Sequence, residues 1–79
     1  MTDNEIFEKL KAIVYDIKDE MPLSMDTALI ESGIMDSLEL INYLTQIEET
    51  FGLNISMDVL IEQKLGKIEN LIKFIQEKA

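Results

Sequence analysis

Ser37 is the residue whose type and setting best allow chemistry. Asp36 precedes it and Glu39 follows, so the two carboxylates have the spacing of a capping box around a helix start. The serine hydroxyl then lies outside the core, at the positive end of a helix dipole, where a phosphate ester is electrostatically favoured. The same residues also begin many ordinary helices, so the pair alone leaves both interpretations open.

The sequence argues against catalysis and against a metal site. It contains no histidine and no cysteine, so the usual general base for a serine nucleophile and the commonest metal ligands are missing, and only Asp, Glu or Lys could act as the base. No strand is predicted before Ser37 and no glycine follows it at nucleophile-elbow spacing. A calcium loop starting at Asp26 has Ala28 and Ile30 where oxygen ligands are needed. We therefore expect no catalytic residue and no bound metal.

Length and composition predict one small domain over residues 1–79. The chain has 79 residues, of which 47% are hydrophobic, enough for a packed core. No apolar run approaches the roughly 20 residues of a membrane span, and the acidic N-terminus lacks the apolar core of a signal peptide. Together with the absent cysteines, this favours a cytoplasmic protein without a membrane span.

Charge is distributed unevenly along the chain. The net charge is −9, which argues against a nucleic-acid partner. Ten carboxylates lie between Asp19 and Gln63, a span without Lys or Arg, whereas all seven lysines lie in the flanking segments. Solubility alone can explain such acidity. The more specific interpretation is that the middle of the chain faces basic protein partners.

Apolar periodicity predicts four helices, over residues 2–18, 37–51, 57–63 and 67–77, separated early on by a long first loop. In the second helix one face collects Ile41, Leu44, Ile47 and Phe51, with Leu40 beside them and Tyr43 at the boundary. In the short third helix Val59, Leu60 and Ile61 are expected to point inward. Gly52 and Gly66 fit helix ends. The expected fold is an all-α bundle with three longer helices and one short third helix.

The chain resembles the phosphopantetheine-binding acyl carrier and peptidyl carrier proteins over nearly its whole length. The matching residues are Leu29, Gly33, Asp36-Ser37-Leu38, Ile41, Leu44, Ile47, Glu48, Glu49, Phe51 and Gly52. The resemblance implies a small four-helix bundle of acyl-carrier type, acting as a non-catalytic monomer. It also implies a 4′-phosphopantetheine arm on Ser37, with Asp36 and Leu38 flanking the site. A separate phosphopantetheinyl transferase would attach the arm from coenzyme A, and its thiol would hold acyl or aminoacyl groups as thioesters.

The resemblance further implies a partner-binding surface on the second helix. Its predicted members are Asp36, Glu39, Leu40, Asn42, Glu48 and Glu49. The partners would be the transferase, an acyl- or aminoacyl-loading ligase and downstream synthase or transferase enzymes. The chain departs from the family pattern at Leu40, Asn42, Tyr43 and Lys67, the last of which stands where the family often has a Thr or Ser that caps the final helix. These departures favour a specialised lipid, polyketide or peptide pathway over a housekeeping fatty-acid carrier.

Two further questions stay open at this level. The cargo and its loading enzyme are not encoded in any motif. Side chains beside the second and third helices are either plain core or the lining of a cleft for an acyl chain; they are Leu40, Tyr43, Leu44, Leu60 and Ile61.

The alternative function is a small acidic helical adaptor that binds a basic protein and carries no prosthetic group.

Overall fold

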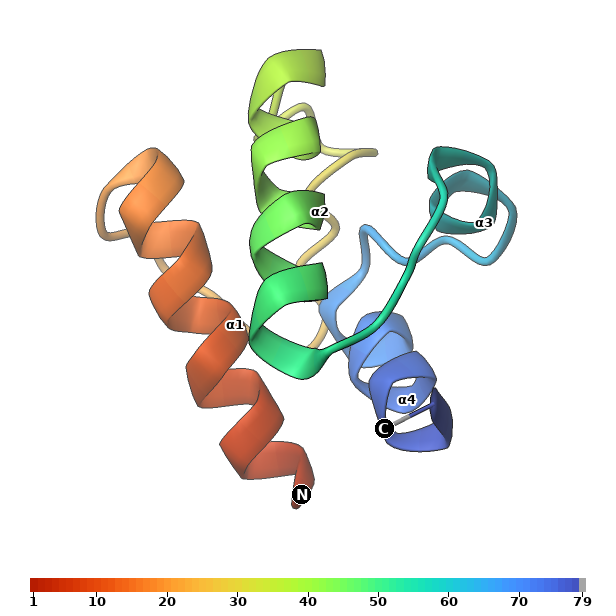
Figure 1. Ribbon diagram of the computed structural model, residues 1–79. Coiled ribbons are helices and arrows are strands. Elements are labelled where there is room, and N and C mark those ends of the chain that lie inside the picture. Colours follow the sequence, from red (N-terminus) through yellow and green to blue (C-terminus); the bar gives the residue numbers. More distant parts are fainter. Residues whose placement is uncertain (79) are drawn as a thin grey trace.

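The computed structural model describes residues 1–78, which fold into four helices (Figure 1). The helices are α1 (Asp3–Lys18), α2 (Ser37–Phe51), α3 (Met57–Glu62) and α4 (Ile68–Lys78). Within these residues, extended pairing is limited to an isolated bridge between Ala28 and Lys67. The predicted all-α bundle with a short third helix is confirmed. α2 runs beside α1, and its start lies at the opposite end of the molecule from the start of α1 and the end of α4 (Figure 1).

Each of the first three helices begins at a side-chain N-cap. The Thr2 hydroxyl accepts the Glu5 N–H at 3.1 Å, and the Glu5 carboxylate accepts the Thr2 N–H at 3.1 Å. Ser56 caps α3 through the Val59 N–H. α2 ends at Gly52, whose φ of 68° is the left-handed conformation that glycine adopts without a steric penalty. Local sequence therefore defines most helix boundaries.

The start of α4 depends on the long first loop. The N–H groups of Ile68 and Glu69 donate to the backbone oxygens of Thr27 and Met25, each at 3.0 Å. These amides have no partner within their own helix, so the loop replaces a side-chain cap. Lys67, predicted as the first helical residue, instead forms the bridge with Ala28 just before the helix. The missing Ser or Thr cap is thus compensated by tertiary contacts.

The loop packs closely against Gly66. The Leu29 N–H donates to the Gly66 backbone oxygen at 2.8 Å, and Leu29 is fully buried. A Cβ atom at position 66 would lie 2.7 Å from Cγ1 and Cδ1 of Ile30 and 3.1 Å from its Cβ. An added Cβ atom would therefore require the Ile30 side chain to move, which is why glycine fits this position. Met35, at the end of the loop, is also buried and anchors it to the core, whereas Met25 nearer its start is exposed.

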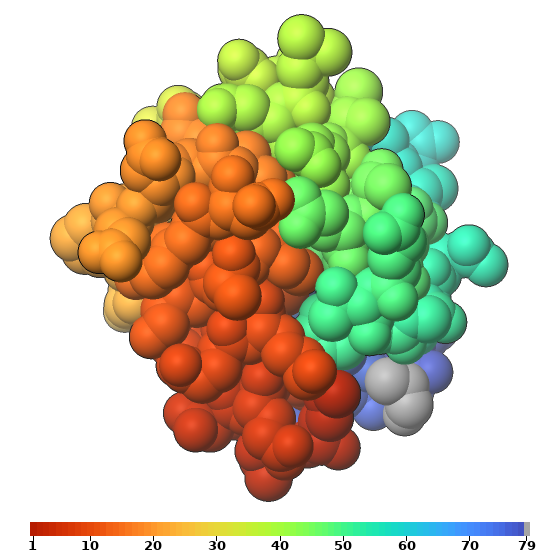
Figure 2. All heavy atoms as spheres, turned by 60° about the vertical axis from the view of Figure 1, so that its left-hand side comes forward, coloured from red at the N-terminus to blue at the C-terminus, as the bar shows by residue number. Residues whose placement is uncertain are grey.

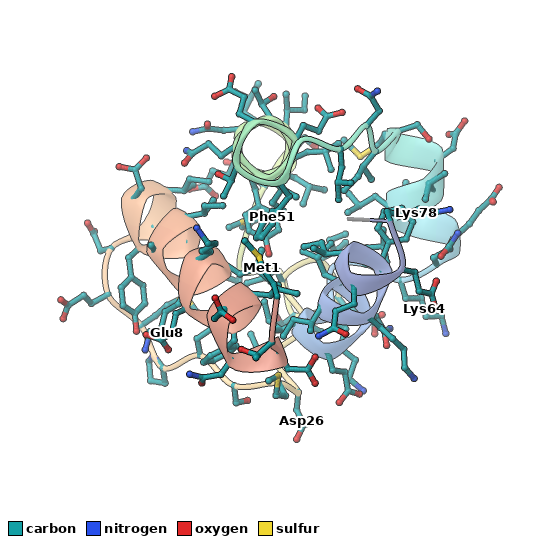
Figure 3. All side chains as sticks on the ribbon, turned by 60° about the horizontal axis from the view of Figure 1, so that its bottom comes forward. Met1, Glu8, Asp26, Phe51, Lys64 and Lys78 are labelled. Atoms are coloured by element: carbon teal, nitrogen blue, oxygen red, sulfur yellow. The ribbon has the colours of Figure 1, made fainter. Side chains whose placement is uncertain are left out.

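The buried face of α2 differs from the predicted one. Ile41 was expected in the core but is 51% exposed, whereas Tyr43, expected at the boundary, is fully buried. Leu40, Leu44 and Ile47 complete the buried face. In α3, Ile61 was expected to point inward but is 62% exposed. Both helices carry more apolar residues than one buried arc can hold, so packing against neighbouring helices decides which remain outside. Seen along α2, mostly carbon side chains point into the space between α1, α2 and α4, while many polar tips point outward around the bundle (Figure 3).

The Tyr43 hydroxyl is the polar group least well accommodated in this core. It is buried and, among the described residues, has no hydrogen-bond partner. Burial raises the pKa of Tyr43 above its ordinary value, because the phenolate would lose its hydration. An unsatisfied buried hydroxyl destabilises a fold by about 1–3 kcal/mol.

We expect Gly66→Ala to lower the free energy of unfolding by about 1–3 kcal/mol, because the new methyl group overlaps Ile30. Urea denaturation measures the loss. The double variant Gly66→Ala/Ile30→Ala tests the cause: if the clash is responsible, the double variant loses less stability than the sum of the two single changes. Additive losses would show that Ile30 is not the obstacle.

Tyr43→Phe is expected to raise the free energy of unfolding by about 1 kcal/mol at about pH 7, since it removes the unpartnered hydroxyl. Above about pH 10 the unfolded chain loses the tyrosine proton while the folded chain keeps it, so the parent loses stability as pH rises. The gap between variant and parent should therefore widen, by up to about 1.4 kcal/mol per pH unit. Urea denaturation at about pH 7 and again above about pH 10 checks this, with Tyr15→Phe as the control. A constant gap would contradict it.

Candidate functional site

The start of α2 is held by two reciprocal hydrogen bonds. The Asp36 carboxylate accepts the Glu39 N–H at 2.8 Å, and the Glu39 carboxylate accepts the Asp36 N–H at 3.1 Å. Asp36 is in the extended conformation, and its backbone oxygen accepts the first helical bond, from Leu40, at 2.9 Å. This is the predicted capping box, and it makes Ser37 the first residue of the helix.

Ser37 and its neighbours lie outside the core. Asp36, Ser37 and Leu38 are all exposed, with Leu38 79% accessible, while Met35 before them and Leu40 after them are buried. The start of α2, yellow-green in Figure 2, protrudes at the top of the molecule. A group attached to the Ser37 hydroxyl would therefore meet solvent rather than apolar side chains. The helix dipole also favours a negative charge at this end.

Lys18 is a member of this site that sequence reasoning missed. Its Nζ lies 3.1 Å from Oε1 and 3.0 Å from Oε2 of Glu39, and so it ties the end of α1 to the start of α2. The seam between the two helices is visible in Figure 2. Farther along it, the Gln46 amide donates to Asp16 at 3.2 Å. The only sequence signal for Lys18 was its place as the last lysine before the acidic middle of the chain.

The predicted partner-binding residues do not all share one surface. Asp36, Asn42 and Glu49 are exposed, whereas Leu40 is only 8% accessible and lies in the core. Leu40 is therefore wrong as a surface residue, because its direction on the helix is the one that α2 buries. Glu39 and Glu48 are half-buried and bonded within the chain, Glu39 to Lys18 and Glu48 to the Ile55 N–H at 2.9 Å. The solvent-facing side of α2, called here the outer face, consists of Leu38, Ile41, Asn42, Thr45 and Glu49.

Comparison with known proteins decides the family. A family model described as "Phosphopantetheine attachment site" matches residues 8–75. An acyl carrier protein from Petrotoga mobilis is 34% identical over 80 residues, which covers 99% of this chain and 92% of that protein. The chain belongs to the acyl carrier protein family. It is a non-catalytic carrier, and the group that its family binds is 4′-phosphopantetheine.

The carrier's residues fit a covalent phosphodiester. The Ser37 side chain is exposed, so no core packing must open to admit a phosphate. The Asp36 carboxylate is engaged with the Glu39 N–H. The backbone N–H groups at the helix start provide partial positive charge. The alternative of an acidic adaptor without a prosthetic group finds no support in the family matches.

The carrier also has a small apolar pocket beside α3. It encloses about 200 Å³ and is lined by Ile30, Glu31, Leu60, Ile61, Lys64 and Gly66. Two of the predicted cleft residues, Leu60 and Ile61, lie there. The other three, Leu40, Tyr43 and Leu44, belong to the buried core, as Leu60 does, but do not line this pocket. Among residues 1–78, no helix is both long and apolar enough to cross a membrane.

Proposed function

We propose that Ser37 carries the 4′-phosphopantetheine arm and that residues 1–79 act as a single carrier domain for acyl or aminoacyl thioesters. The observation that carries this proposal is the exposed hydroxyl at the first position of α2, held in place by the Asp36–Glu39 cap. Among the chain's serines, Ser37 combines exposure with a position at the start of a long helix, where a phosphate is favoured.

The attachment reaction needs a separate enzyme. A phosphopantetheinyl transferase would bring coenzyme A to the start of α2. The Ser37 oxygen would form a bond to the phosphorus that bears the pantetheine, the pyrophosphate bond of coenzyme A would break, and adenosine 3′,5′-bisphosphate would leave. The hydroxyl proton would pass to a base of the transferase, because this chain has no histidine and the carboxylates of Asp36 and Glu39 are engaged in the helix cap. The attached thiol then supplies the thioester chemistry that a chain without cysteine lacks.

The carrier's contribution is positional. A flexible arm on an exposed helix start keeps the cargo at high effective concentration for each enzyme that binds the carrier. We propose a loading ligase and downstream synthase or transferase enzymes as these partners. The departures at Asn42 and Tyr43 favour a specialised lipid, polyketide or peptide pathway.

Ser37→Ala tests the attachment point. Incubation of the parent protein with coenzyme A and a promiscuous phosphopantetheinyl transferase should add the mass of one phosphopantetheine, detected by intact-protein mass spectrometry. Ser37→Ala should gain nothing. Ser32→Ala, which removes another exposed serine hydroxyl, should be modified like the parent. Modification of Ser37→Ala, or an unchanged parent with several transferases, would refute the proposal.

We further propose that partner enzymes bind the outer face of α2 together with Asp36. Leu38 and Ile41 expose apolar side chains one helical turn apart, while Asp36 and Glu49 place carboxylates at the two ends of this surface. Apolar contact would supply affinity, and the carboxylates would guide a basic partner toward it. Glu39 and Glu48 contribute their charge although each is already bonded within the chain.

Glu49→Lys is the cleanest test of this surface, because Glu49 is exposed on the outer face. The variant should be modified about two- to tenfold more slowly at low ionic strength, as measured by initial rates of mass gain. Glu77→Lys, which makes the same charge change on α4, should have a much smaller effect. The difference should shrink as salt is added. Equal slowing by both variants would mean that only net charge is recognised.

A further inference from the structure

The ion pair between Lys18 and Glu39 occupies a carboxylate two residues after the proposed attachment point. Lys18 Nζ contacts both carboxylate oxygens, at 3.1 and 3.0 Å, while Oε1 also accepts the Asp36 N–H at 3.1 Å. The Lys18 and Glu39 side chains are 30% and 26% exposed, so solvent reaches the pair. A partner that approaches the start of α2 therefore finds the Glu39 carboxylate already paired with the Lys18 ammonium group.

Lys18 opposes a basic partner in two ways. It places a positive charge beside the helix start, in a region where residues 19–63 contribute carboxylates but no Lys or Arg. A basic surface that approaches this region is repelled by a like charge. Lys18 also holds both oxygens of Glu39, which is the arrangement that an arginine guanidinium would adopt with two parallel hydrogen bonds.

We propose that Lys18 masks Glu39 in the free carrier and that an arginine of the phosphopantetheinyl transferase replaces it on docking. This inference rests on the proposed function. The exchange is favourable because partly exposed ion pairs are weak, whereas the planar guanidinium fork matches a carboxylate better than an ammonium group does. The helix cap survives the exchange, since a carboxylate has enough lone pairs to keep the Asp36 N–H while it accepts the new donor. Lys18 is thus a residue that limits docking.

Lys18→Met should accelerate modification of Ser37. At low salt we expect the second-order rate constant with coenzyme A and the transferase to rise roughly two- to fivefold, the range that corresponds to one exposed ion pair. Lys11→Met is a matched control: its ion pair with Glu8 stays within α1, and Lys11 has a similar side-chain exposure of 31%. Both variants change the net charge equally. Faster modification of Lys18→Met alone therefore cannot result from overall charge.

Unfolding experiments separate masking from a structural role. If Lys18 only stabilised the packing of α1 on α2, its loss would lower both the stability and the rate of modification. Masking instead predicts that the stability measured by urea denaturation is unchanged or slightly lower, while the rate of modification rises. In about 1 M salt, where the Debye length is about 3 Å, the acceleration should largely disappear.

Glu39→Gln identifies the carboxylate as the group that is unmasked. Glutamine can still accept the Asp36 N–H, so the cap is kept while the charge is lost. In this background Lys18→Met should bring no further acceleration. The inference is overturned if Lys18→Met is no faster than Lys11→Met, or if it still accelerates modification when residue 39 is glutamine. If neither the parent nor any variant other than Ser37→Ala gains mass, the proposed function fails and this inference fails with it. If Lys18→Met and Lys11→Met gain mass at equal rates, only this inference is refuted.

Discussion

The reciprocal hydrogen bonds between Asp36 and Glu39 determine where α2 begins, and the geometry of the site depends on that point. Each residue added to a helix turns the chain by about 100°, so a start displaced by one residue would redirect every following side chain. Met35 is buried just before the cap and Leu40 just after it. Between these two anchors the chain has only Asp36, Ser37, Leu38 and Glu39 with which to pass outside the core. The serine is therefore presented to solvent by a short segment fixed at both ends.

The long first loop acts as a structural element although it contains no helix. Its backbone oxygens at Met25 and Thr27 cap α4, and its Leu29 amide bonds Gly66. The same segment delivers Asp36 to the start of α2. A 79-residue chain has a small core, so a loop that satisfies the backbone groups of another helix stabilises the fold without adding residues. The connection between α3 and α4, the start of α4 and the site-bearing helix are thereby joined through one segment.

The acidic residues around α2 are not equivalent, despite their similar appearance in the sequence. Asp36 and Glu39 complete a cap, Glu39 also pairs with Lys18, and Glu48 holds the Ile55 amide in the connection to α3. Glu49 is exposed on the outer face. Net charge describes the long-range field that attracts a basic partner. Which carboxylates form direct contacts depends on the bonds each one must give up.

The sequence by itself determined the local events: the caps at Thr2, Asp36 and Ser56, the left-handed stop at Gly52, and the family of the chain. These features depend on neighbouring residues, so a linear pattern contains them. Tertiary structure alone decided that Tyr43 rather than Ile41 is buried, that loop carbonyls cap α4, and that Lys18 reaches Glu39. Two of these involve residues that are distant in the chain, so no local pattern contains them. The third is a choice among several apolar positions, and periodicity cannot make that choice when the apolar arc of a helix is wider than the face that its neighbours cover.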